Sequence, residues 1–182
     1  MKLKALFGLE KPYEDTAFTL YGSIVAQARQ PYFYSDLNVE DTLEGRYDMI
    51  IMHAFLLFYR LKGESKNATE LGQVVFDTMF KDFDQSLREM GVGDMGVGPR
   101  IKKMASSFYG RAGAYDKALE AGGNDELEQV IARNVFNKTE PDKRALEHLA
   151  TYMRRNVEQL ELVSVEKILE GELRYVDPEA LN

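Results

Sequence analysis

The 182-residue chain contains no cysteine and only two histidines, His53 and His148. The absence of cysteine excludes disulfides, thiol catalysis and thiolate metal sites, and it is consistent with a reducing compartment. No Glu-x-x-His sequence occurs, so the signature of di-iron helical bundles is missing. Two histidines are also too few to assemble a pair of nucleophile and base. We therefore expect a cytoplasmic protein that has no catalytic activity, cofactor or metal.

The chain also lacks a long hydrophobic run. Its most apolar stretch, "MIIMHAFLLFY" at residues 49–59, is about half of the roughly 20 residues that span a bilayer. We interpret it as the most buried helix of the core. The first residues, "MKLKALFGL", are too short an apolar run for a signal peptide, and we expect residues 1–13 to form a flexible N-terminus. The net charge of -7 argues against a general nucleic-acid-binding surface.

Strand periodicity is absent as well, because the apolar residues recur at helical spacing nearly everywhere. Pro31 ends the first helix, and an aromatic segment and a polar link lead to the second. We predict an all-α, single-domain bundle of six to seven helices over residues 14–171, with an acidic C-terminal tail at 172–182. The expected helices cover about residues 14–29, 42–62, 67–90, 99–119, 125–136, 141–160 and 165–171.

Glycine is concentrated between the third and fourth predicted helices, where "GVGDMGVGPR" holds four glycines in eight residues. Gly91, Gly93 and Gly96 match the spacing G-x-G-x-x-G of dinucleotide-binding loops. That motif has to follow a strand and open a helix, whereas these glycines follow a long helix. We therefore predict a helix-helix connection, with Gly91 ending one helix and Pro99 in the first turn of the next. Four glycines also suggest close approach by another backbone.

A cationic stretch follows the glycines and reverses the overall charge locally. No acidic residue occurs between Asp94 and Asp116, while the same stretch carries four cations and several aromatic residues. Because arginine and tyrosine are favoured at binding hot spots, this helix is a candidate binding surface as well as a possible solvated helix edge. The candidate residues are Gly91, Gly93, Asp94, Arg100, Lys102, Lys103, Tyr109, Arg111 and Tyr115.

His53 is the remaining candidate, because it lies in the middle of the most apolar stretch. A buried histidine is usually a hydrogen-bonded core residue, which is our interpretation. The alternative is that His53 is an axial ligand in a carrier of haem or quinone. His148 lies on a charged helix face, and we expect it to be solvated.

Four stretches of the chain resemble the ubiquinol–cytochrome c chaperone family. They are "YDMIIMHAFLLFYRL" (47–61), "LGQVVFDTMFKDFDQSLREMG" (71–91), "LREMGVGD" (87–94) and "IKKMASSFYGRAGAY" (101–115). The resemblance covers about residues 15–160, and the chain looks like an alphaproteobacterial member of the family. It implies an all-helical chaperone that binds newly made cytochrome b and supports assembly of the bc1 complex, without catalysis.

The resemblance also implies possible partners, namely the ribosome and a small partner protein, and possible peripheral contact with the inner membrane. We hypothesise that the glycine-rich connection and the cationic, aromatic helix after it form the client site. The cations would pair with acidic groups of immature cytochrome b, and Tyr109 and Tyr115 would supply stacking area. A small-ligand carrier and a general structural adaptor remain as alternatives.

Overall fold

The computed structural model describes residues 12–136 and 140–181, so most of the expected flexible N-terminus lies outside the described residues. Within these ranges the chain forms helices and no strand, which confirms the all-α prediction. The elements are α1 (Glu14–Ala28), α2 (Pro31–Ser35), α3 (Leu43–Leu61), α4 (Lys66–Glu89), α5 (Asp94–Glu120), α6 (Asp125–Val135), α7 (Lys143–Glu161), α8 (Val165–Leu169) and the 3-10 helix η2 (Pro178–Leu181).

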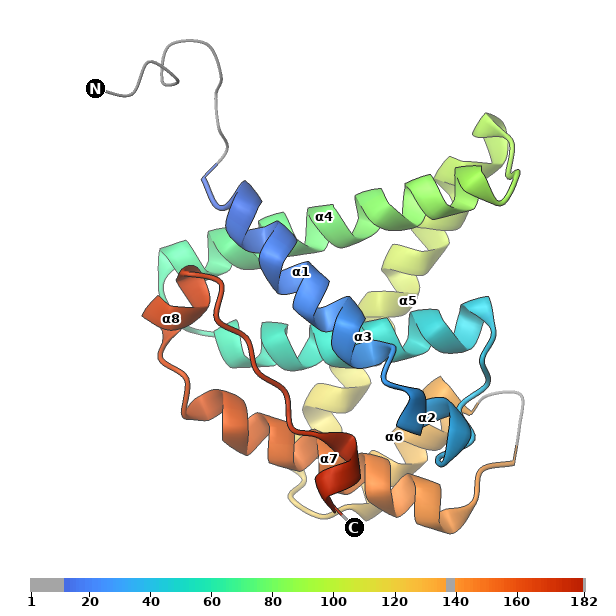
Figure 1. Ribbon diagram of the computed structural model, residues 1–182, viewed down its shortest axis with the longest axis vertical. Helices are drawn as coiled ribbons and strands as arrows, with labels where there is room; N and C mark the ends of the chain where they lie inside the picture. The colour runs from blue at the N-terminus through green and yellow to red at the C-terminus, as the bar shows by residue number, and fades with distance from the viewer. Residues whose placement is uncertain (1–11, 137–139, 182) are drawn as a thin grey trace.

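Helix α3 is the centre of the molecule, as its apolar sequence predicts. Figure 1 shows it crossing the middle, with α4 above, α7 below, α1 in front and α5 behind. Every residue from Asp48 to Leu57 is buried. Each large apolar side chain buried in this way contributes about 1.5–3 kcal/mol to folding, which is why a continuous apolar run occupies the core rather than the surface.

The ends of the central helices are set by local chemistry. The Thr42 hydroxyl accepts a hydrogen bond from the backbone N–H of Gly45, 3.2 Å away, and so caps α3. Gly45 itself has no room for a side chain, since a Cβ there would lie 2.0 Å from the backbone oxygen of Glu40. Gly91 ends α4 with a φ of 82°, a left-handed conformation that glycine adopts without strain.

Helices α4 and α5 form a long antiparallel hairpin whose tip lies at the upper right of Figure 1. The aromatic stripe of α4 faces inward, as its spacing predicts: Phe76 and Phe80 pack against Phe108 of α5, and Phe83 packs against Tyr47 of α3. On its outer side Arg88 pairs with Asp84 at 2.6 Å, one helical turn away. The hairpin is therefore joined by aromatic contacts along one seam.

Two helices, α2 and α5, differ from the sequence-based expectation. Residues 31–35 form a short helix, α2, which is too short to show a period. Helix α5 begins at Asp94 rather than at Pro99, so Gly96, Gly98 and Pro99 are helical and the connection shrinks to residues 90–93. The low helix propensity of glycine is outweighed here because Val97 is fully buried and Asp94 pairs with Arg88 at the new N-terminus.

The segment expected as an acidic tail packs onto the body of the protein. The Tyr175 hydroxyl donates to the backbone oxygen of His53 at 2.8 Å, and the backbone N–H of Val176 donates to Asn156 Oδ1 at 2.9 Å. His148 Nε2 lies 2.8 Å from the backbone oxygen of Pro178, so the expectation of a solvated histidine is wrong. None of the helices in the described part of the chain combines the length and the apolar character needed to cross a membrane.

Candidate functional site

The nine residues predicted for a binding surface all lie on the α4–α5 connection or on α5, but the structure separates them into two groups. Seven are exposed to solvent: Gly91, Gly93, Asp94, Arg100, Lys102, Lys103 and Tyr109. The other two, Arg111 and Tyr115, point into the protein. The reason is helical geometry, since residues in one helix distribute around its whole circumference.

Arg111 forms an internal ion pair. Its guanidinium contacts the carboxylate of Asp48 on α3, whose side chain is only 4% exposed, and lies 5.7 Å from the centre of the Tyr47 ring. The guanidinium therefore serves to neutralise a buried acid. The sequence contains no signal for this contact, because the two partners are 63 positions apart.

Tyr115 is a core residue, and the expectation that it supplies stacking area at the surface is wrong. Its side chain is 1% exposed and its ring centre lies 5.3 Å from that of Phe55. Burial raises the pKa of Tyr115 above its usual range, because a phenolate would be poorly solvated in the core. Tyr115 falls on the same side of α5 as Phe108, which explains its position.

The exposed cations have a different environment. Arg100, Lys102 and Lys103 take part in none of the ion pairs formed between described residues. Arg88, at the end of α4, is held by both Asp84 and Asp94. Three positive charges on the tip half of α5 are thus available to an external group.

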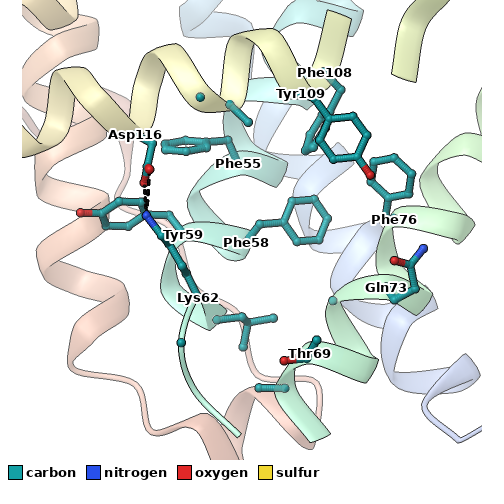
Figure 2. Close-up of a pocket in the computed structure, with 16 residues that line it drawn as sticks. Phe55, Phe58, Tyr59, Lys62, Thr69, Gln73, Phe76, Phe108, Tyr109 and Asp116 are labelled. Carbon is teal, nitrogen blue, oxygen red and sulfur yellow. Dashed lines mark hydrogen bonds and ion pairs between the residues drawn. The ribbon is translucent and has the colours of Figure 1, made fainter. Parts of the chain in front are cut away.

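A groove lies between α3, α4 and α5, where α5 contributes residues 108–116 and none of these three cations (Figure 2). Its volume is about 520 Å³, and its lining is mostly apolar. Figure 2 shows Phe58 pointing into its middle, with Phe76 and Tyr109 on one side and Thr69 below. The lining residues are Phe55, Phe58, Tyr59, Leu61, Lys62, Gly63, Ala68, Thr69, Gly72, Gln73, Phe76, Phe108, Tyr109, Ala112, Gly113 and Asp116.

Small residues open this groove and one ion pair marks its end. Ala68, Gly72, Ala112 and Gly113 line it where larger side chains would fill it. At one end Lys62 Nζ lies 2.8 Å from Asp116 Oδ2, and both side chains are partly exposed. The groove was not predicted, because its small residues come from two helices whose relative position the sequence does not specify.

Tyr109 links the groove to the cationic part of α5. Its side chain is 63% exposed, yet its ring centre lies 5.6 Å from both Phe76 and Phe108. The ring is therefore held in place by its neighbours while one face remains open. Rigid, exposed aromatic rings of this kind are favourable contact points for a partner.

His53 is a hydrogen-bonded core residue, as expected. Its Nδ1–H donates to the backbone oxygen of Met49 at 2.7 Å, so its Nε2 accepts from the Tyr152 hydroxyl at 2.9 Å. Burial lowers the pKa of His53 to about 4, so the ring is neutral at pH 7. Because both nitrogens are occupied, His53 has none to offer as an axial ligand. Within the described residues no cluster of three or more acidic or histidine side chains is arranged to hold a metal.

An all-α body with an open, aromatic-lined groove and three exposed, unpaired cations on one of the helices that line it has the form of a helical binding protein. Comparison with known sequences specifies it further. The sequence model of the ubiquinol–cytochrome C chaperone family matches residues 35–175, and the chain therefore belongs to that family. This confirms the resemblance found in the sequence.

Individual relatives agree with this assignment. The crystal structure of the Cbp3 homologue from Brucella abortus superimposes with a TM-score of 0.85, at 40% identity, over 94% of each chain. Ubiquinol-cytochrome c reductase complex assembly factor 1 of mouse is 25% identical over 87% of this chain, and mitochondrial protein CBP3 of Saccharomyces cerevisiae is 25% identical over 81%. The chain spans about half the length of these two relatives, 54% and 45% respectively.

Proposed function

We propose that this protein assists the assembly of ubiquinol–cytochrome c reductase by binding newly made cytochrome b, and that the exposed face of α5 is its client site. The observation that carries the proposal is the family membership over residues 35–175, together with relatives that are named for assembly of this complex. The surface of α5 supports the placement, because its cations and Tyr109 are open to solvent.

The client site is accordingly narrower than the sequence suggested. Arg100, Lys102, Lys103 and Tyr109 remain in it, together with Gly91, Gly93 and Asp94 at the hairpin tip. Arg111 and Tyr115 are excluded because they stabilise the fold. Binding in this scheme needs no catalytic group: the cations attract acidic segments of the client, and the aromatic groove farther along α5 takes up apolar side chains.

Charge reversal tests the proposal. The triple variant Arg100→Glu, Lys102→Glu and Lys103→Glu should fold normally, because these side chains are exposed and unpaired among the described residues. We expect cytochrome b that co-purifies with the tagged protein from cells to fall about tenfold, and assembled complex to fall with it, since rim charges control encounter with a partner.

The matched control reverses three exposed cations on α7, which contributes no residue to the groove: Lys143→Glu, Arg144→Glu and Arg155→Glu. It should retain cytochrome b at the level of the unmodified protein. Equal recovery of cytochrome b with the α5 variant and the unmodified protein would contradict the placement of the site. No cytochrome b with the unmodified protein would contradict the function itself.

A further inference from the structure

The groove between α3, α4 and α5 does not end at α5. A second hollow, of about 580 Å³, lies on the other side of this helix, between α5 and α6. Tyr109 and Gly113 line both hollows. The two together form a track that crosses α5 at an angle, with Tyr109 beside the crossing point. An elongated partner fits such a track better than a compact small molecule.

No contact inside the protein requires glycine where the track crosses α5. Gly110 and Gly113 are exposed helical residues, and a Cβ placed on either would meet no atom within 4 Å. Each glycine inside a helix costs about 1 kcal/mol of stability relative to alanine. Packing within the protein therefore does not explain why glycine occurs twice here. Close approach of another backbone does explain it, because glycine is the residue that lets two backbones come together.

The charge along the track selects the kind of partner. Lys117 and Arg133 line the second hollow together with one acid, Glu126, whereas Arg100, Lys102 and Lys103 line neither hollow and lie beyond the track toward the hairpin tip. None of these five cations forms an ion pair with another described residue. The acids Asp116 and Glu120 both face Lys62, at 2.8 and 3.9 Å. The first hollow is therefore lined mostly by apolar side chains, and the second carries two cations against one acid, in a protein of net charge -7.

From this geometry we propose that the track binds an amphipathic α-helix of the client, whose apolar face lies on the aromatic floor and whose acidic residues face the cations of α5. The inference rests on the proposed function and specifies its binding mode. The helix crosses α5 at Gly110 and Gly113, where the two backbones approach, and Tyr109 packs along its side. Recognition of an apolar helix face by a groove requires anchors spaced at i, i+3 or i+4, and i+7.

Substitution at the crossing point tests this mode. The variant Gly110→Leu with Gly113→Leu places two side chains in the path of the helix without disturbing the interior, since both positions face open space. We expect at least a tenfold loss of cytochrome b that co-purifies with the full-length protein. Gly22→Leu is the matched control, because Gly22 is also an exposed helical glycine with nothing within 4 Å, but it belongs to α1 and lines neither hollow. It should retain full binding.

Photo-cross-linking in cells provides the second measurement. A photoreactive phenylalanine replaces Tyr109, and in a control it replaces Phe18, which is 73% exposed on α1 and away from the track. The Tyr109 probe should cross-link to one segment of cytochrome b at positions three or four residues apart, and the Phe18 probe should not. Cross-links only to lipid, or to a segment without helical spacing, would overturn the inference.

The two proposals fail in different ways. If the unmodified protein recovers no cytochrome b, the proposed function is wrong. If it recovers cytochrome b and the Gly110→Leu, Gly113→Leu variant recovers as much, the function stands and the helix-binding track is wrong. Loss of binding in the Gly22→Leu control as well would also contradict the track, because that residue does not line it.

Discussion

At the scale of single residues, His53 belongs to a chain of hydrogen bonds that crosses the core. Gln27 Nε2 donates to the Tyr152 hydroxyl, which donates to His53 Nε2, and His53 Nδ1–H donates to the backbone oxygen of Met49. The first two steps join α1 to α7 and α7 to α3, and the last lies within α3. The neutral form of the imidazole is required, because only that form both donates and accepts.

This requirement predicts a loss of stability in acid. The pKa of His53 is about 4 in the folded protein and about 6.5 when unfolded, so below pH 6.5 the unfolded state binds the extra proton first. The contribution is therefore present above pH 6.5 and is lost as the pH falls toward 4. Urea unfolding at pH 7 and pH 4.5 should show a His53-dependent decrease of about 2–3 kcal/mol. In His53→Gln this part of the decrease should be absent. If the variant lost as much unfolding free energy between pH 7 and pH 4.5 as the unmodified protein, the role assigned to His53 would be wrong.

Arg111 and Lys103 are both cations of α5, but they should contribute very differently to the stability of the fold. Arg111→Ala removes the cation that faces the buried carboxylate of Asp48, and we expect the free energy of unfolding to fall by about 3 kcal/mol. Lys103→Ala removes an exposed charge and should change stability by less than about 0.5 kcal/mol. Chemical denaturation of both variants measures this. Similar values for the two would contradict the separation of structural and binding cations on α5.

At the scale of helices, the glycines of the hairpin have opposite roles that substitution with alanine should reveal. Gly91→Ala forces a side chain into a φ of 82° and should destabilise the protein by about 1 kcal/mol. Gly110→Ala meets open space within a helix and should stabilise it by about 0.5–1 kcal/mol. Melting temperatures should shift in opposite directions, by roughly 2–4 °C each for a domain of this size. A lower melting temperature for Gly110→Ala would mean that an internal contact needs that glycine.

Spacing in the sequence was sufficient to predict most helices and their inward faces. The stripe of α4 and the apolar run of α3 needed no knowledge of their partners, and Thr42 and Gly91 mark helix ends by local chemistry alone. The groove and the Arg111–Asp48 pair depend on how distant helices cross, which periodicity does not encode. The start of α5 was misplaced because local propensity favours a glycine loop, whereas the burial of Val97 is a tertiary effect.

At the scale of the whole molecule, the last residues join helices that are far apart in the chain. Gln27 of α1 donates to the backbone oxygen of Val176, Tyr175 donates to α3, and Asn156 of α7 accepts from Val176. Leu173 and Pro178 of this segment are buried. The C-terminal segment thus closes the side of the bundle formed by α1, α3 and α7, and it lines no part of the groove.

Removal of residues 172–182 should therefore weaken the fold while leaving the groove intact. The truncation exposes apolar surface around His53 and leaves the fully buried Asn156 side chain without its Val176 donor, so we expect a loss of about 3–6 kcal/mol. The melting temperature should fall by roughly 10 °C or more. Tyr175→Phe, which removes one hydroxyl, should cost only about 1 kcal/mol. Below its melting temperature the truncated chain should still recover cytochrome b, because α3, α4 and α5 hold the groove without it. Two results would contradict this division between the side that stabilises the bundle and the side that binds. One is a truncated chain with the same melting temperature as the full chain, and the other is a truncated chain that stays folded but recovers no cytochrome b.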